Sequence, residues 1–348
     1  YGYHRNLHSF PTRRSSDLDR QPEFPGSLWA GPPASAAPLD LTPPGPLRPF
    51  LRLGACSWKY DSWKGLLYDP RRTYRAGDYL ADYAAHLNTV EVDQWFWSLF
   101  PSGVVLPASD TARQYADSVP EDFRFTVKAP NAITLTHYYH TQPKSAAGFA
   151  DRPNPHFLDL DLLDGFLERL APMGRKLGPV MFQFEYLNRR KMPTAAAFLE
   201  RLDRFLAGAP KGYQYAVEIR NPDWLGSAFF DLLAVHIAGV VFLEGYYMPP
   251  IGEVWERFRP ATADFAVIRL HGPDRMKIEQ MSGDRWDRIL DPHPEGLAAA
   301  AGIIRANAAR KAVTFVNVNN HFEGAAPRSI SRLLLMLMQE GQSPNGQG

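Results

Sequence analysis

Acidic and basic side chains occur together at the ends of segments that read as buried β-strands. In the stretch Thr89–Trp97, Glu91 and Asp93 share one face of a strand, because side chains alternate along an extended chain. Two acids on an otherwise apolar strand are costly unless they are paired or used. A carboxylate beside a Lys or Arg ionises readily and suits a general base, whereas one crowded by other acids suits a general acid. The chemistry that this pattern predicts is proton transfer.

Similar polar endings follow six further strand-like segments, which predicts one shared site. The candidates for catalysis are Glu91, Glu218, His271 and Lys128. The candidates for binding substrate are Asp93, Gln183, Arg220, Arg269, Asn317, Asn319, Asn320, His321, His137, Tyr60 and Trp97. The basic members would bind or stabilise developing negative charge. The alternative is a ring of structural ion pairs, since buried charges persist only when they are paired.

A divalent metal is a second possibility for the same residues. Glu91, Glu218 and His271 lie on three different strands and could bind an ion that activates a water molecule. The sequence holds no H-E-x-x-H motif and no paired cysteines, and a lone His is more often a hydrogen-bonded structural residue. We therefore leave the cofactor unknown, and no nucleotide-cofactor motif is present.

Three further features each have a functional and a structural interpretation. The stretch Asn319–Pro327 could present backbone N–H groups to an anion, or it could form a turn capped by Asn side chains. Tyr60 and Trp97 could stack on a sugar or base, although most aromatic residues near strand ends pack helices against a sheet. Cys56 is not expected to be a nucleophile, because no Cys–His–Asp order is evident and Cys is commonly buried.

Strand-like and helix-like segments alternate from Leu51 onward. The expected strands are Leu51–Cys56, Thr89–Asp93, Arg124–Lys128, Val180–Phe184, Tyr215–Ile219, Val240–Leu243, Ala266–Leu270 and Val313–Val318. The expected helices are Ala76–Leu87, Ala108–Ser118, Asp159–Met173, Thr194–Ala207, Gly226–His236, Ile251–Phe258 (the weakest), Glu295–Ala309 and Pro327–Gln339. Eight such units predict a (β/α)₈ TIM barrel, whose active sites lie at the C-terminal mouth, where the polar strand ends would meet.

An open, doubly wound sheet is the competing fold. It would normally bring a Gly-rich first turn, and neither G-x-G-x-x-G nor G-x-x-x-x-G-K-S/T occurs in the chain. Two connections, Ala129–Phe157 and His271–Pro294, follow the third and seventh expected strands and are longer than simple links. Long loops of this kind are usually lids or binding loops, or are disordered.

Composition restricts the class of partner. The net charge is +1, and residues 1–50 hold five of the 38 basic and four of the 37 acidic residues, which leaves 33 of each in the remainder. A neutral body makes nucleic acid an unlikely partner, because such binding depends on phosphate neutralisation. The chain contains no run of eighteen or more apolar residues, so no membrane span is expected. The single Cys56 and the absence of a secretory signal favour a cytoplasmic protein.

The chain divides into four parts by composition. Residues 1–18 resemble the translation of a sequencing-library adapter, and we interpret them as an assembly artefact. Residues 19–50 are expected to be a disordered linker, since nine prolines fall between residues 22 and 49. Residues 51–340 form the expected single barrel domain, and residues 341–348 a disordered tail.

Several motifs, in the same order along the chain, resemble a known family. They are Gly54–Tyr60, Trp63–Gly65, Thr89–Phe100, Phe123–His137, Leu177–Phe184, Val217–Trp224, Val267–Gly272 and Val316–Ala326. Together they resemble domain-of-unknown-function family seventy-two, also called the YecE-like family, from about Leu51 to Leu337. The resemblance implies a TIM barrel and no assigned reaction. The family's Val-Glu-Ile-Asn-Ser-Thr-Phe-Tyr type of motif reads Val-Glu-Val-Asp-Gln-Trp-Phe-Trp here, so the substrate shape is expected to differ from that of relatives.

These observations lead to one functional hypothesis and two alternatives. We expect an enzyme, of hydrolase or isomerase/lyase type, that uses acid–base or metal-assisted chemistry on a small polar substrate. A sugar, a nucleotide fragment or a phosphorylated and therefore anionic metabolite would fit the mixed-charge site. The alternatives are a non-catalytic binding or scaffold protein and, less favoured, a nucleic-acid-processing protein. The sequence leaves the oligomeric state open.

Overall fold

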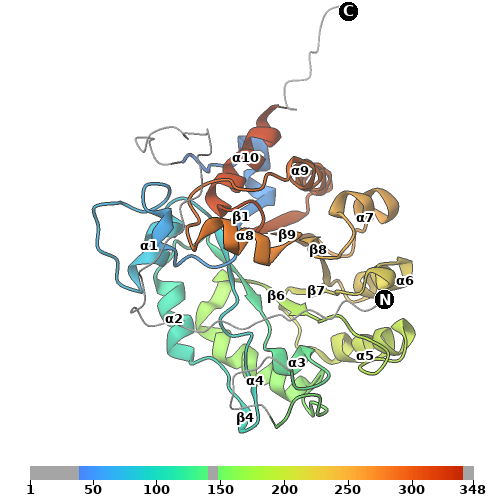
Figure 1. The fold of residues 1–348 in the computed structure, drawn as a ribbon. Helices are drawn as coiled ribbons and strands as arrows, with labels where there is room; N and C mark the ends of the chain where they lie inside the picture. The colour runs from blue at the N-terminus through green and yellow to red at the C-terminus, as the bar shows by residue number, and fades with distance from the viewer. Residues whose placement is uncertain (1–38, 140–147, 340–348) are drawn as a thin grey trace, which may run out of the picture.

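Eight parallel strands form the centre of the molecule in a computed structural model, which describes residues 39–139 and 148–339 (Figure 1). Their order in the sheet is β1-β10-β9-β8-β7-β6-β5-β2. The strands are β1 (Leu51–Ala55), β2 (Thr89–Val92), β5 (Arg124–Lys128), β6 (Leu177–Gln183), β7 (Tyr215–Glu218), β8 (Gly239–Gly245), β9 (Phe265–Gly272) and β10 (Val313–Val318). Strands that are adjacent in the sheet are consecutive barrel strands along the chain, as a (β/α)₈ barrel requires. The predicted fold is therefore confirmed.

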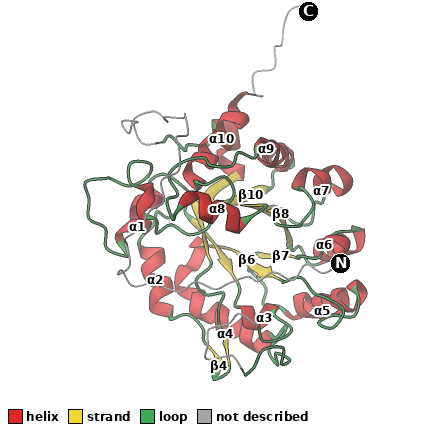
Figure 2. Cartoon of the chain, viewed as in Figure 1, coloured by secondary structure: helices red, strands yellow, loops and turns green. Residues whose placement is uncertain are grey.

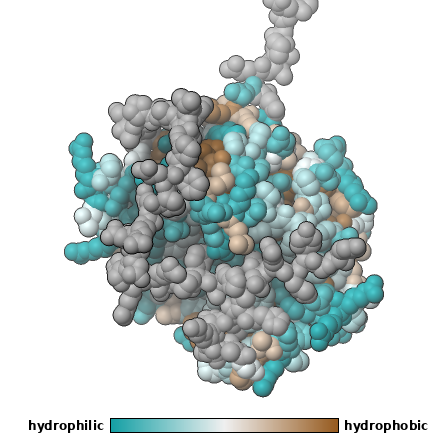
Figure 3. Space-filling model, viewed as in Figure 1, coloured by the Kyte–Doolittle hydropathy of each residue, from teal (hydrophilic) through white to brown (hydrophobic). Residues whose placement is uncertain are grey.

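Helices lie outside the strands and connect them (Figure 2). They are α1 (Asp78–Ala84), α2 (Ser109–Asp117), α4 (Leu160–Leu170), α5 (Ala195–Gly208), α6 (Ser227–Val235), α7 (Ile251–Phe258), α9 (Pro294–Ala309) and α10 (Ala326–Gln339). Asp159 and Thr194 cap α4 and α5 by accepting backbone N–H groups three residues ahead. The outer surfaces of α5 and α7 are largely hydrophilic (Figure 3), so these helices turn their apolar faces to the barrel.

Side chains help to close the barrel between β1 and β2. The Asn88 side chain accepts from Leu53 N at 2.8 Å and donates to Leu51 O at 3.2 Å. The buried Tyr83 hydroxyl accepts from Ala55 N and donates to Thr89 O. A Cβ added at Gly54 would lie 1.9 Å from Thr89 O, so only glycine allows this close approach. The seam ends at a parallel bridge between Cys56 and Glu91.

The barrel interior changes from apolar to polar along its axis. A separate buried cluster includes Met181, Val241, Val267 and Phe315. Further along β10, buried Asn317 pairs with Arg269 of β9 and Gly54 of β1. Side chains therefore fill the lower barrel, and charged and amide groups are confined to the end nearest the strand C-termini.

The two long connections contain elements that periodicity did not reveal. The connection after β9 holds α8 (Arg275–Ser282), which lies in front of the strands in Figure 1. The connection after β5 holds the short α3 (Asn131–Thr134). Outside these two connections, a hairpin of two-residue strands, β3 (Leu99–Phe100) and β4 (Gly103–Val104), follows β2. These pieces are shorter than the window over which an amphipathic period can be recognised.

Residues 39–50 differ from the expected linker. Leu41 is 3% exposed, and the 3₁₀ helix η1 (Gly45–Phe50) leads directly into β1. Burial of the apolar Leu41 explains why this Pro-rich end packs instead of remaining extended. Residues 1–38 and 340–348, which carry the expected artefact, the rest of the linker and the tail, lie outside the described residues.

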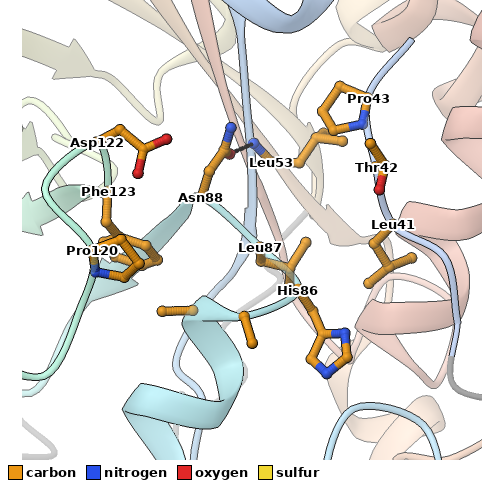
Figure 4. A pocket seen from close by; sticks show the side chains of 12 residues that line it. Leu41, Thr42, Pro43, Leu53, His86, Leu87, Asn88, Pro120, Asp122 and Phe123 are labelled. Carbon is orange, nitrogen blue, oxygen red and sulfur yellow. Dashed lines mark hydrogen bonds between the residues drawn. The ribbon is translucent and has the colours of Figure 1, made fainter. Parts of the chain in front are cut away.

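A cavity of about 170 Å³ lies beside this packed segment (Figure 4). Leu41, Pro43, His86 and Phe123 are among the residues that line it, and Asn88 reaches across to Leu53. Asn88 and Phe123 precede β2 and β5, so the cavity lies at the N-terminal end of the barrel. Active sites of this fold lie at the opposite end of the barrel, where the buried charged residues Glu91, Glu218 and Arg269 also lie.

Among the described residues, no helix combines the length and apolar character needed to cross a membrane.

Candidate functional site

Arg269 is the centre of the charged cluster at the mouth. The side chain is 2% exposed and extends from β9 into the barrel. Its Nε donates to Glu91 Oε2 at 2.8 Å and its Nη2 to Glu91 Oε1 at 2.7 Å. Its Nη1 donates to Gln183 Oε1 at 3.0 Å and also to Glu218 Oε2. One guanidinium thus joins β2, β6 and β7, with the two-point geometry that suits Arg and carboxylate.

Glu218 is held by two arginines. Its second oxygen, Oε1, accepts from Arg220 Nε at 2.9 Å, and the Glu218 side chain is 1% exposed. Burial disfavours the charged carboxylate, but Arg269 and Arg220 outweigh this effect and lower the pKa of Glu218. The charges of Glu218 and Glu91 in turn outweigh the burial of Arg269 and raise the pKa of its guanidinium. Both oxygens of Glu91 and of Glu218 are therefore occupied, and Glu218 is an ionised partner of arginine.

Lys128 differs from the other buried charges in that no described residue accepts a hydrogen bond from it. The side chain is 9% exposed at the end of β5, and its Nζ lies 3.9 Å from the centre of the Phe96 ring. Lys128 makes no hydrogen bond or ion pair among the described residues. Its attractive contact is instead with the ring face of Phe96, which attracts a cation. Burial, and then the charge of Arg269, lower the pKa of this ammonium. Nearby Glu91 and Asp93 oppose that shift.

Asp93 lies at the rim, just beyond β2. It is solvent-accessible, but the surrounding walls of the mouth raise the pKa of its carboxyl, and Lys128 only partly offsets this. Lys128 and Asp93 are therefore a base and an acid whose pKa values are both moved toward neutrality.

His271 lies next to a buried thiol. Its Nε2 is 3.7 Å from Cys56 Sγ, and its Nδ1 is 3.1 Å from the Tyr246 hydroxyl. Cys56 Sγ also donates to Glu91 Oε2 at 3.5 Å. Burial and the charge of Arg269 hold the pKa of His271 well below its usual value, so the imidazole is neutral. Burial and Glu91 raise the pKa of Cys56, which is therefore a thiol.

An unusual backbone conformation places Tyr246. The register of β8 and β9 shifts between Glu244 and Gly245, and Tyr246 has φ +56°. A Cβ on Gly245 would lie 2.4 Å from Gly272 O, so β8 and β9 approach more closely there than another residue would allow. The Tyr246 ring then lies 4.9 Å from the Arg220 guanidinium. Non-glycine residues adopt such conformations where the surroundings fix them, often at functional sites.

The amide candidates fall into two groups. Gln183 contacts Arg269 directly, and Asn317 accepts a long 3.5 Å hydrogen bond from Thr126. Asn319 instead accepts from His321 N within its own turn. Asn320 accepts from Ala326 N at 2.9 Å at the start of α10, which is the structural interpretation of this motif. Its amide nitrogen faces Tyr60 without forming a hydrogen bond of good geometry.

Two of the predicted histidines, His137 and His321, do not join the cluster. His321 contacts Glu279 of α8 at 3.1 Å, and burial lowers the pKa of His321 to about 4. His137 contacts Thr136, and burial together with Lys191 lowers its pKa. Glu244 also turns away, because its Oε2 accepts from Ile251 N at the start of α7.

Exposed aromatic side chains follow several strands at the rim. Trp97 is 49% exposed, and its ring centre lies 6.0 Å from that of Tyr139. Tyr186 and Tyr247 follow β6 and β8, are 52% and 58% exposed, and form an edge-to-face pair. Tyr60 packs on buried Trp63, with ring centres 4.6 Å apart. Trp97 can thus meet a ligand, whereas Tyr60 mainly packs.

The geometry therefore joins most of the predicted residues and adds two. Arg269 contacts Glu91, Glu218 and Gln183 directly. The predicted metal set Glu91, Glu218 and His271 differs from the set that the structure brings together, because the donor atoms that lie within 4.8 Å of one another belong to Cys56, Glu91 and His271. Cys56 takes the place of Glu218, and Tyr246 supports His271. The sequence offered one signal for Cys56 and Tyr246, which is that each directly follows a strand.

The comparisons with known proteins agree with this architecture. A family profile described as "Protein of unknown function DUF72" matches residues 52–347. A crystal structure of a DUF72 family protein from Thermotoga maritima superposes with a TM-score of 0.57 at 21% identity, covering 83% of this chain and 99% of that one. One from Enterococcus faecalis gives 0.56 at 18% identity, covering 86% and 99%. No match was found among curated proteins.

Proposed function

Because this chain belongs to the DUF72 family, whose name assigns no reaction, we propose a function from its own side chains: an enzyme that transfers protons on a small anionic substrate at the barrel mouth. The observation that carries the proposal is Lys128, a buried ammonium with no acceptor among the described residues. A buried charge without a partner is costly, and an anionic ligand would remove that cost.

Arg220 supplies the second contact to the anion. Its Nε is used by Glu218, but the side chain is 15% exposed and its guanidinium lies over the Tyr246 ring. The charges of Lys128 and Arg220 are close enough to act on one another, since Arg220 contributes to lowering the pKa of Lys128. Two cations of this kind suit a phosphate or carboxylate.

Lys128 and Asp93 are the proposed proton-transfer pair. A lysine with a lowered pKa can accept a proton, and an aspartic acid with a raised pKa can donate one, at a pH where ordinary side chains do neither. Glu91 and Glu218 would act differently from the simplest expectation: they hold Arg269 and Arg220 in place. This division of roles fits isomerase or lyase chemistry on a phosphorylated or acidic sugar, with Trp97 and Tyr247 available for stacking on the ring.

Ligand binding by the intact protein tests this proposal. We expect glucose 6-phosphate and inorganic phosphate to raise the melting temperature, and glucose alone to have little effect. At a concentration of 100 times Kd, a ligand adds about 2.7 kcal/mol of stability. Lys128→Met should abolish the increase, whereas the control Lys211→Met, at an exposed position before β7, should retain it. An equal response in Lys128→Met and the wild type would contradict the proposal.

A further inference from the structure

Three side chains from three strands bring different metal-binding atoms together at the mouth. Cys56 follows β1, Glu91 lies on β2 and His271 lies on β9. Their donor atoms all lie within 4.8 Å of one another, and all three residues are buried. No such set is evident in the order of residues along the chain, because 215 positions separate Cys56 from His271.

The spacing of the donor atoms matches tetrahedral zinc. Bond lengths of about 2.3 Å for Zn–S and about 2.0–2.2 Å for Zn–N and Zn–O place sulfur about 3.6 Å from either other donor at a tetrahedral angle. In the structure, Cys56 Sγ lies 3.5 Å from Glu91 Oε2 and 3.7 Å from His271 Nε2. The three side chains therefore need little movement to surround an ion.

The contacts around the three residues are also those of a metal site. Metal-binding histidines usually donate the other ring N–H to a partner, and here His271 Nδ1 faces the Tyr246 hydroxyl at 3.1 Å. In the tautomer that carries its proton on Nδ1, the Nε2 lone pair is directed toward Cys56. Metal-binding carboxylates are likewise oriented by hydrogen bonds, and Arg269 holds both oxygens of Glu91.

We propose that Cys56, Glu91 and His271 bind one Zn²⁺ ion, with a water or a substrate oxygen as the fourth ligand. A thiolate and an imidazole select zinc over Mg²⁺ or Ca²⁺, which prefer oxygen ligands. On binding, the ion replaces the thiol proton of Cys56, and that proton passes to solvent. Three protein ligands and one open position are typical of catalytic zinc sites. The proposal does not depend on the anion site at Lys128.

The competing interpretation is a Cys56–His271 pair that acts without metal. Such a pair needs a thiolate that substrate can reach, yet Cys56 is 5% exposed and donates to Glu91. A carboxylate beside the sulfur opposes thiolate formation unless a cation is added between them. Glu91 thus distinguishes the two interpretations in favour of metal.

Co²⁺ substitution tests the site directly, because Cys56 is the only cysteine in the chain. Full-length protein stripped with chelator should take up one equivalent of Zn²⁺, measured by elemental analysis. Co²⁺ should give the visible bands of tetrahedral coordination and a sulfur-to-cobalt charge-transfer band, which can arise only from Cys56. Bound Zn²⁺ should also protect Cys56 from a thiol reagent under native conditions.

Four variants separate the metal site from general effects on folding. Cys56→Ser should remove the charge-transfer band, and His271→Asn should abolish stoichiometric binding. Tyr246→Phe should weaken Zn²⁺ binding by roughly 10- to 100-fold. The control His236→Gln, at a histidine that follows α6 and contacts Asp203, should bind as the wild type does. Circular dichroism confirms that each variant is folded. Wild-type protein that binds no Zn²⁺, or that gives no charge-transfer band with Co²⁺, would overturn the proposal.

Discussion

Arg269 and Glu91 form a two-point ion pair across the barrel interior, between β9 and β2, with N–O distances of 2.8 and 2.7 Å. The two residues are 178 positions apart in the chain. Neither side chain is more than 2% exposed, so the pair is shielded from water and salt. Arg269 also binds Glu218, which makes it the residue that holds the upper barrel together.

Arg269→Met should destabilise the protein strongly. The substitution leaves Glu91 and Glu218 as buried carboxylates without their main partner, and breaking a buried pair in this way costs about 3–5 kcal/mol. Chemical denaturation measures the loss. Arg204→Met is the matched control, since Arg204 and Glu200 are 68% and 70% exposed, and such surface pairs contribute about 0–1 kcal/mol. Similar losses in both variants would show that the Arg269 network has no special role.

Gly54→Ala should weaken the closure of the barrel. The new Cβ would lie 1.9 Å from Thr89 O, so β1 and β2 would have to move apart, and overpacking of this kind costs about 1–3 kcal/mol or more. Gly302→Ala in α9 is the control, because open space surrounds that position and alanine favours a helix by about 0.5–1 kcal/mol. Unfolding free energies should therefore change in opposite directions. A neutral Gly54→Ala would mean that β1 and β2 are not closely packed.

Anion binding should be lost at a lower pH than an ordinary lysine predicts. The pKa of Lys128 is lowered from 10.5, so the ammonium that holds the anion is present below the lowered pKa and disappears as pH rises through it. Sulfate is a suitable probe because its charge is constant over this range. Calorimetric titration should show affinity falling on the alkaline side, and Lys128→Arg should move that fall to higher pH. A wild-type affinity that stays constant up to pH 10.5 would contradict the assignment.

Charged Lys128 favours anion binding, but it lowers the stability of the folded protein when no ligand is bound. Because its pKa is lower in the folded state, the charged form costs stability at neutral pH, and this cost declines as pH rises from the folded toward the unfolded value. Lys128→Met should therefore be neutral or stabilising without ligand at pH 7, while it abolishes anion binding. A substitution that raises stability and removes binding is expected where a residue serves function.

The barrel could be predicted from sequence because its strands and helices have strong local patterns. Arg124–Lys128, Val313–Val318 and Ile251–Phe258 have the expected bounds, and others differ by a few residues at their ends. The short α8 and α3 were not predicted, since they depend on the loops around them. The packing of Leu41 was also missed, because a Pro-rich composition does not indicate which apolar residue finds a partner.

The site could be predicted only as a set of residues. Alternation along strands placed Glu91, Glu218 and Arg269 in the interior, but it could not show that Arg269 occupies both carboxylates. Distances across the barrel decide this, as they decide that Cys56 meets His271. His321 and Asn320 looked equally suitable in sequence, yet their partners are Glu279 and the start of α10. Residue type predicts chemistry, and three-dimensional contacts decide which atoms remain available.

Turnover measured on a mixture of phosphorylated sugars tests the central claim most directly. Full-length protein is incubated with the mixture, and mass spectrometry follows each component with and without the enzyme. We predict that at least one component is depleted while a product accumulates, that Lys128→Met prevents this, and that Lys211→Met does not. A component that binds the wild type but is recovered unchanged would contradict an enzymatic role and identify the chain as a binding protein.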